Sequence, residues 1–327
     1  MGMDRMAALQ GFSAQVLGHD RFAVTPASAD ASFRRYFRLR GDGQTWIVMD
    51  APPDKEKLEP FVRIATKLEE IGLNVPGIIG CDFTQGFCVL TDLGERPYLN
   101  ELQAGTVERL YGDALGALVV LQTGTFLDPE FLPPYSRDML LAEMELFRAW
   151  YLGRHLGIRL SDQESAMLSS AFASLADAAL QQPQVWVHRD FHSRNLMIDP
   201  RHNPGILDFQ DAVRGPITYD LVSLLRDCYV AWPRDQVVDW VKGYCALSRE
   251  SGLHGLEDEA CFVEWFDRMG VQRHLKVAGI FARLHHRDGK SGYLADLPLT
   301  LRYLEEATAL YADLRPLHEF LLALPRP

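Results

Sequence analysis

The stretch VHRDFHSRNLMIDPRHNPGILDFQD (187–211) constrains the fold more than any other part of the chain. It places four aspartates beside short apolar runs, which predict a strand pair over 195–199 and 206–209 joined by PRHNPG. Because a hairpin brings its two ends together, we expect Asn195 and Asp208 to be neighbours. An amide oxygen and a carboxylate are hard ligands that suit Mg²⁺.

Asp190 lies ahead of this strand pair, in a loop that follows the apolar run QVWV. A phosphoryl transferase needs metal ligands that clamp the nucleotide phosphates and a carboxylate that orients the acceptor and takes its proton. The stretch supplies both. It therefore predicts a phosphoryl-transfer site with Asp190 as the catalytic carboxylate and with Asn195 and Asp208 as the magnesium ligands.

The motif HRDFHSRN, followed by ILDFQD and GPITYDLVSLL, resembles the signatures of the protein-kinase-like superfamily. Within it, the whole chain is similar to the aminoglycoside and choline phosphotransferase family. The resemblance implies an α+β, protein-kinase-like bilobal fold, with ATP and Mg²⁺ as cofactors. A small antiparallel-sheet N-lobe (1–93) would bind nucleotide, and a larger, mostly helical C-lobe (94–327) would carry catalysis and acceptor binding. His188 and Asp220 would be structural residues that brace the catalytic loop.

The hydrophobic pattern along the chain fits such a division. Four extended runs predict two strand pairs, over 32–40 with 45–51 and over 77–83 with 86–93. Asp42-Gly43 is a hairpin signal within the first pair. Apolar residues at helical spacing predict helices over 55–71, 101–122, 136–155, 161–181, 216–231, 234–251, 257–287 and 298–323.

Charge and composition limit the partners. The formal net charge of −11 argues against a nucleic-acid partner, because phosphate backbones require clustered Lys and Arg. The chain has no apolar run long enough for a signal peptide or a membrane span. We therefore expect a cytoplasmic monomer with small-molecule partners only. Five cysteines without a CxxC motif are expected to be buried free thiols: Cys81, Cys88, Cys228, Cys245 and Cys261.

The expected nucleotide site departs from the family pattern in the strand TWIVMDAPP. Related kinases carry a cation there, but an alignment on the apolar triplet puts Asp50 at that position and Val48 over adenine. A carboxylate cannot hold triphosphate by Coulomb attraction. The candidate substitutes, among which the sequence does not choose, are Lys55, Lys57, Arg63, Arg35 and Arg38.

Two further segments complete the expected nucleotide site. PASADASFRRYF has small residues in place of a GxGxxG loop, so backbone N–H groups and hydroxyls such as that of Ser32 would approach phosphate. VLTDLGE follows an apolar strand at the expected hinge. Adenine would pair there with the backbone of Asp92, Leu93 and Gly94.

The acceptor is expected to be a small molecule, because only eleven residues separate Asp208 from Asp220 and leave no room for a protein kinase's activation segment. RYFRL, VMDAPP, FVRIA and RDGKSGYLADLPLTLRYL are similar to one branch of the family, the bacterial anomeric kinases for N-acetylmuramate and N-acetylglucosamine in cell-wall recycling. The resemblance implies phosphorylation of the C1 hydroxyl. A same-fold kinase for an aminoglycoside, choline or homoserine, or a non-catalytic nucleotide-binding regulator, remains an alternative.

Muramate carries a lactyl carboxylate, which a cation would bind, ideally a bidentate arginine. Arg273, Lys276 and Arg283 share one helical stripe in QRHLKVAGIFARLHH, although a solvated helix face would show the same pattern. The substrate-binding candidates are His192, Arg194, Asp211, Arg214, Arg273 and Lys276.

Overall fold

The computed structural model describes residues 2–29 and 33–325. The chain divides into two compact units: residues 1–114 with 194–211, and residues 115–193 with 212–327. The strand pair after the catalytic loop thus groups with the N-terminal sheet. The predicted division into functional lobes at residues 93 and 94 stays a prediction.

The first unit is built on a five-stranded antiparallel sheet, as the strand pairs of the sequence predict. The strand order is β1-β2-β3-β5-β4. Asp42 and Gly43 both have positive φ, so the Asp-Gly turn between β2 and β3 forms as expected. The strands are β1 (Ala23–Ala29), β2 (Arg35–Gly41), β3 (Gln44–Asp50), β4 (Ile78–Asp82) and β5 (Phe87–Thr91).

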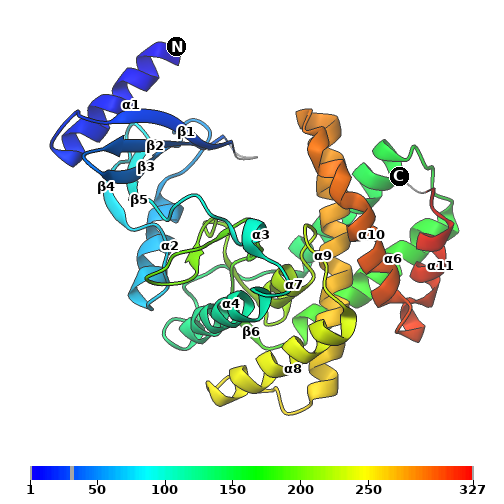
Figure 1. Cartoon of the computed structure of the whole chain (residues 1–327). Helices are drawn as coiled ribbons and strands as arrows, with labels where there is room; N and C mark the ends of the chain where they lie inside the picture. Colours follow the sequence, from blue (N-terminus) through cyan, green and yellow to red (C-terminus); the bar gives the residue numbers. More distant parts are fainter. Residues whose placement is uncertain (1, 30–32, 326–327) are drawn as a thin grey trace. The chain divides into compact units, whose positions relative to one another are not determined.

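Helix α1 (Gly2–Leu17) and strand β1 were not predicted. Strand β1 is an edge strand of this sheet, and α1 packs against the sheet (Figure 1). Leu9 of α1 joins a buried cluster with Phe37, Leu39, Val48 and Val89 of the strands. These strand residues alternate along β2, β3 and β5, so they occupy one face of the sheet. That face therefore forms an apolar core together with α1.

The remaining elements of the first unit are short except for one helix. Helix α2 (Glu59–Glu70) has its apolar residues on one stripe, with Phe61, Ile64 and Leu68 buried. The predicted strand pair of the opening stretch is present as β7 (Leu196–Met197) and β8 (Gly205–Ile206), with Leu196 opposite Ile206. Helix α3 (Tyr98–Glu101) leads to α4 (Val107–Thr123), within which the two units meet along the chain.

The prediction that all five cysteines are free thiols is wrong for two of them. Cys81 on β4 and Cys88 on β5 form a disulfide, with their Cα atoms 4.1 Å apart. The two residues face each other in the antiparallel register, which brings their side chains together. Strand register is not visible in cysteine spacing, and for this reason the sequence did not reveal the pair. Cys228, Cys245 and Cys261 are free.

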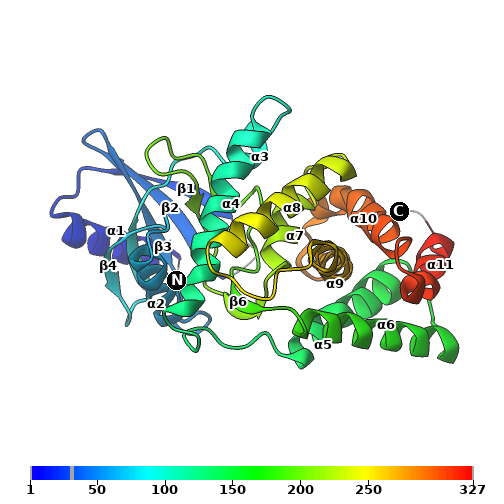
Figure 2. The ribbon, with the colours of Figure 1, turned by 90° about the horizontal axis from the view of Figure 1, so that it is seen from below.

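The second unit is mostly helical and is organised around α9 (Glu259–Asp288), which Figure 2 shows almost end-on. Asp258 caps its first turn, and Gly289 ends it with a left-handed φ of 69°. Gly279 lets α9 approach Leu146, because a Cβ there would lie 2.3 Å from the Leu146 carbonyl carbon. The side chains of α9 are buried along most of its length.

The other elements of the second unit surround α9 or join the helices. Ser161 and Glu164 form a capping box at the start of α6. The helices are α5 (Arg137–Leu146), which continues as a π-helix (Phe147–His155), α6 (Asp162–Leu180), α7 (Tyr219–Leu225), α8 (Arg234–Glu250), α10 (Leu297–Thr308) and α11 (Arg315–Ala323). Two strands, β6 (Gln184–Val187) and β9 (Val213–Pro216), pair antiparallel, and short 3-10 turns cover Gly124–Phe126, Ser291–Asp296 and Ala312–Leu314.

Most predicted helices are present, with three corrections. The helix predicted over 101–122 begins only at Val107, and α7 is much shorter than the predicted 216–231. The helix predicted over 298–323 is interrupted between α10 and α11. Among the described residues, no helix combines the length and the apolar character that a membrane span requires.

Candidate active site

A pocket of about 600 Å³ lies within the first unit, on the face of the sheet opposite the α1 cluster. Tyr36, Arg38, Ile47 and Leu90 line it from the sheet, and they alternate with the core residues of the same strands. Further lining residues come from the predicted hinge and from the opening stretch, among them Asp92, Leu93, Gly94, Glu95, Arg194, Asn195, Met197, Leu207, Asp208 and Phe209. The size and the largely apolar sheet wall suit a nucleotide base.

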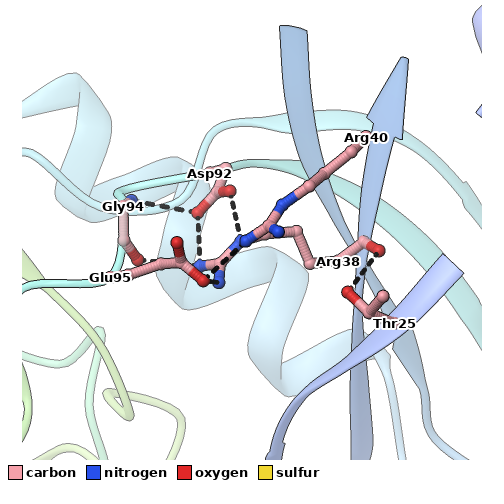
Figure 3. Close-up of polar contacts among 6 residues, drawn as sticks. All are labelled: Thr25, Arg38, Arg40, Asp92, Gly94 and Glu95. Carbon is pink, nitrogen blue, oxygen red and sulfur yellow. Dashed lines mark hydrogen bonds and ion pairs between the residues drawn. The ribbon is translucent and has the colours of Figure 1, made fainter. Parts of the chain in front are cut away.

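The hinge side of this pocket is held by a buried arginine (Figure 3). Arg38 donates to both carboxylate oxygens of Asp92, at 2.6 and 3.0 Å, and to the carbonyl of Gly94 at 2.8 Å. It also pairs with Glu95, which accepts from Arg40 at 2.7 Å. Burial opposes ionisation of Asp92, but the hydrogen bonds from Arg38 hold its pKa below the ordinary value. The network fixes the backbone that the sequence predicts for adenine.

Asn195 and Asp208 are neighbours, as the hairpin argument predicts. The amide nitrogen of Asn195 donates to Asp208 Oδ2 at 3.3 Å, and both residues line the pocket. The backbone of Leu207 donates to the carbonyl of Asn195 at 2.9 Å, which ties the two ends together. Asp208 has a positive φ of 65°, a conformation that is uncommon outside glycine. It follows strand β8 and is not part of it. Gln210 donates to its other oxygen at 2.6 Å.

The strand expected to cover adenine needs a correction by one residue. Val48 lies fully buried in the α1 cluster, and Ile47 is the β3 residue that lines the pocket. Neighbouring side chains of a strand point to opposite faces, so a one-residue error exchanges the two roles. Met49 shares the face of Ile47 and is fully buried.

Asp50 therefore lies on the strand face opposite to the pocket. It shares the Val48 face and accepts from Arg5 of α1 at 2.8 Å and from Arg35 at 3.1 Å. Arg35 is thus paired with Asp50, and Arg38 is paired at the hinge. Of the candidate substitutes for the missing strand cation, Lys55, Lys57 and Arg63 stay predictions, and Ser32 lies outside the described residues.

The catalytic loop lies in the second unit and is held by Asp220 in the way the resemblance implies. Asp220 accepts from the backbone nitrogens of His188 and Arg189, at 2.6 and 2.9 Å. Burial raises the pKa of Asp220 to about 7, although both backbone N–H groups favour its ionised form. His188 accepts from the backbone nitrogen of Asp190 at 3.2 Å, a bracing contact. Arg189 has a φ of 78°, so the loop turns sharply just before Asp190.

The sequence did not reveal a second carboxylate that holds this loop. Asp227 follows α7 and accepts from the backbone nitrogen of Ser193 at 3.0 Å and from its hydroxyl. Asp227 and Ser193 are both buried. The loop is therefore fixed on both sides of Asp190. A single sequence offers no signal for this contact, because the two residues are 34 positions apart.

Asp190 itself is surrounded by positive charge. Burial opposes its ionisation, but Lys276, His192 and Arg273 together hold its pKa below the ordinary value. Asp190 is therefore an ionised carboxylate at neutral pH. This is the state that a proton acceptor requires.

A buried ion network beside the loop was also not predicted. Glu143 of α5 accepts from Lys276 at 3.0 Å and from Gln272 at 3.3 Å, and it pairs with Arg189 and Tyr135. Lys276 further donates to the Tyr219 hydroxyl at 2.9 Å. The network links α5, α7 and α9 to the catalytic loop. Lys276 thus has partners within the protein, and its predicted substrate contact stays a prediction.

The other predicted acceptor contacts are dispersed. His192 packs against the Tyr229 ring, with centroids 5.5 Å apart, and Arg194 lines the pocket of the first unit. Arg214 donates to the carbonyl of Pro129 at 3.1 Å and pairs with Glu130, and Asp211 is exposed. Arg273 is buried near Asp190. Their roles in acceptor binding stay predictions.

Fold and site together define a phosphotransferase of the protein-kinase-like class, and comparison with known proteins agrees. Residues 23–258 match the model of the phosphotransferase enzyme family, and the chain belongs to this family. It is 45% identical over 303 residues to the N-acetylmuramate/N-acetylglucosamine kinase of Pseudomonas aeruginosa, covering 93% of this chain and 89% of that protein. It is 42% identical to the enzyme of the same name from Neisseria meningitidis serogroup B, covering 98% and 96%.

Solved structures bear out the fold class. The choline kinase of Streptococcus pneumoniae superimposes with a TM-score of 0.58 at 12% identity, covering 95% of this chain and all of that protein. At that identity the likeness concerns the fold alone. The α+β, protein-kinase-like fold predicted from the sequence is thereby confirmed.

Proposed function

We propose that the protein is an ATP-dependent kinase that phosphorylates the anomeric C1 hydroxyl of N-acetylmuramate and N-acetylglucosamine for cell-wall recycling. The observation that carries this proposal is the 45% identity to a kinase of that name across 93% of the chain. The site residues support it, because Asn195 and Asp208, the two expected magnesium ligands, line one pocket, and the backbone on both sides of Asp190 is held by hydrogen bonds. A non-catalytic regulator would have no need of Asp190, Asn195 and Asp208 together. Use of ATP places the proposed reaction in the cytoplasm.

The pocket of the first unit would hold ATP. Ile47 and Leu90 supply an apolar wall for the adenine ring, and the backbone from Asp92 to Gly94 offers hydrogen bonds to its edge. Because Arg38 is bound to Asp92 and Gly94, the hinge backbone is rigid before the nucleotide arrives. A prearranged backbone reduces the ordering cost of binding.

Asn195 and Asp208 fit Mg²⁺. They offer an amide oxygen and a carboxylate on one wall of the pocket, and Mg²⁺ accepts one or two protein ligands together with water and phosphate oxygens. Among the described residues, no group of three or more His, Cys, Asp or Glu side chains could hold a metal ion elsewhere. Bound Mg²⁺ would neutralise the charge that develops on the phosphates.

Asp190 would orient the C1 hydroxyl and accept its proton. The surrounding positive charges keep it ionised, and the contacts of Asp220 and Asp227 fix the loop on both sides of it. An anomeric hydroxyl is more acidic than an ordinary alcohol. A carboxylate with a depressed pKa is therefore basic enough to take the proton late in the transfer.

The test is phosphate transfer from ATP to a panel of acceptors: N-acetylmuramate, N-acetylglucosamine, its 1-O-methyl glycoside, an aminoglycoside, choline and homoserine. We expect both free sugars to be phosphorylated. The methyl glycoside should be inert, because it lacks the anomeric hydroxyl. Turnover of choline, homoserine or an aminoglycoside without turnover of either sugar would overturn the proposal. Phosphorylation of the glycoside would reject C1 as the site.

A further inference from the structure

Arg273 is a buried cation that forms no ion pair with a carboxylate of the described residues. It lies on α9 and is 4% exposed. Its one hydrogen bond is a contact of 3.9 Å from Nη1 to the Cys228 sulfur, and its Nε has no acceptor among the described residues. An arginine carries five donors that normally find acceptors when buried. The site around Arg273 is therefore rich in donors and poor in acceptors.

Other buried cations of the second unit are paired. Lys276, one turn further along α9, lies 3.0 Å from Glu143, and Arg226 lies 2.8 Å from Glu306. In the part of the chain that the structure describes, no carboxylate approaches Arg273 within 4.0 Å. Burying a charge without a partner costs several kcal/mol unless another group compensates it. The contrast within one unit singles out Arg273.

The acidic groups around Arg273 do not neutralise it directly. Asp227 is occupied by the backbone and hydroxyl of Ser193. Burial raises the pKa of the Cys228 thiol to about 11, so it is neutral at physiological pH. Arg273 contacts Cys228, and the preceding residue Asp227 binds Ser193 of the loop that contains Asp190, so the guanidinium lies beside this loop.

The two sugars of the proposed function differ at one group. N-acetylmuramate carries a lactyl carboxylate on O3, and N-acetylglucosamine has a hydroxyl there. A planar guanidinium matches a carboxylate by two parallel hydrogen bonds. We propose that Arg273 binds the lactyl carboxylate of N-acetylmuramate and is the residue that determines the preference for it over N-acetylglucosamine. This inference rests on the proposed function.

The other two cations that the sequence suggests for the lactyl carboxylate, Lys276 and Arg214, already have partners in the protein. Lys276 is held by Glu143 and Tyr219, and Arg214 by Glu130 and Pro129. Moving either residue to a substrate would break existing contacts. Arg273 would gain its acid partner from the substrate without losing one, so substrate binding removes the cost of the unpaired charge.

The experiment compares Arg273→Met and Arg273→Lys with the wild type on three acceptors: N-acetylmuramate, its neutral lactyl amide and N-acetylglucosamine. We expect Arg273→Met to lower kcat/KM for N-acetylmuramate about 100-fold, and for the two neutral acceptors by less than about fivefold. Arg273→Lys should lower kcat/KM for N-acetylmuramate about tenfold, because lysine keeps the positive charge but cannot form two parallel hydrogen bonds to a carboxylate. Arg226→Met, which removes a buried arginine that has an internal partner, should leave the ratio between the sugars unchanged.

The outcomes separate the two proposals. Absence of wild-type activity on both sugars would remove the proposed function. Wild-type activity on both, with equal losses in Arg273→Met, would remove this inference alone, because Arg273 would then act through Asp190 or the phosphate. If Arg273→Met does not fold, judged by its thermal unfolding and nucleotide binding, Arg273→Lys and the amide decide. A wild type that does not distinguish the amide from the acid contradicts the inference.

Discussion

Arg38 in the first unit and Arg273 in the second are both buried arginines close to expected ligands, but they differ in their partners. Arg38 is bound by Asp92, Glu95 and the Gly94 carbonyl, whereas Arg273 has a neutral thiol. A guanidinium that the protein itself neutralises holds backbone in place, and one that it leaves without an acid favours an anionic ligand. We therefore expect a structural role for Arg38, in contrast to the binding role proposed for Arg273.

A similar contrast holds for the carboxylates. Asp50, Asp92 and Asp220 are bound by cations or backbone N–H groups and shape the fold around each site. Asp208 lines the pocket of the first unit. Asp190 belongs to the second unit, and its pKa lies below the ordinary value. Substitutions in the second pair should therefore affect chemistry, and those in the first group should affect stability.

The largest effect is expected for Asp190→Asn. Loss of the proton acceptor should lower kcat by about 1,000-fold. Affinity for the nucleotide should stay within about twofold, because the pocket residues belong to the other unit. Steady-state kinetics and calorimetric titration with a non-hydrolysable ATP analogue measure the two quantities.

Asp199→Asn is the matched control, since it alters an aspartate of the same stretch that accepts from the Arg201 backbone in a turn. It should leave kcat within about threefold. If Asp190→Asn and Asp199→Asn had equal effects, the catalytic role of Asp190 would be lost.

Asp208→Asn should come next. We expect it to weaken nucleotide binding about 100-fold in the presence of Mg²⁺, because one of two protein ligands loses its charge. In EDTA the variant and the wild type should bind equally, so the comparison contains its own control. A variant that still responded to Mg²⁺ like the wild type would exclude Asp208 from the metal site.

Arg38→Met should reduce the free energy of unfolding by about 2 kcal/mol at pH 7, because it leaves the buried carboxylate of Asp92 without its charged donor. The folded-state pKa of Asp92 lies below its value in the unfolded chain, so its contribution is present above about pH 4 and is lost as pH falls further. The difference between variant and wild type should therefore shrink at pH 3. Urea unfolding at both pH values measures it.

Arg40→Met serves as the control for this effect, since Arg40 is half-exposed and touches Glu95 only. Its cost should be below about 0.5 kcal/mol. An Arg38→Met penalty that stayed constant between pH 7 and pH 3 would show that Asp92 is not its source.

Much of the site was accessible from the sequence because its geometry is local. A hairpin had to bring Asn195 to Asp208, and a loop after a strand had to precede them. The hinge expected at residues 92–94 follows from the order of the strands along the chain and stays a prediction. By contrast, Asp227 and Glu143 reach the catalytic loop from other helices, and no spacing rule connects them to it. Such contacts arise from tertiary packing, which a single sequence does not encode by pattern.

The secondary structure shows the same limit. Helix α9 was predicted to within about two residues at each end, because caps and a long apolar period mark it. Strands β1 and β9 were missed, since β1 contains a proline and the short strand β9 contains both a glycine and a proline. Alternation indicated that β3 is a strand but not which face is buried. That choice depends on α1, which was itself not predicted.

The smallest expected effect tests this choice of face directly. Ile47→Ala and Val48→Ala each remove apolar atoms from adjacent residues of β3. Ile47 lines the pocket, so its truncation should weaken nucleotide binding about tenfold with little loss of stability. Val48 lies in the α1 cluster, so its truncation should cost about 1–2 kcal/mol of unfolding free energy with affinity nearly unchanged. The reverse pattern would restore Val48 as the residue over adenine and would bring Asp50 back to the phosphate position.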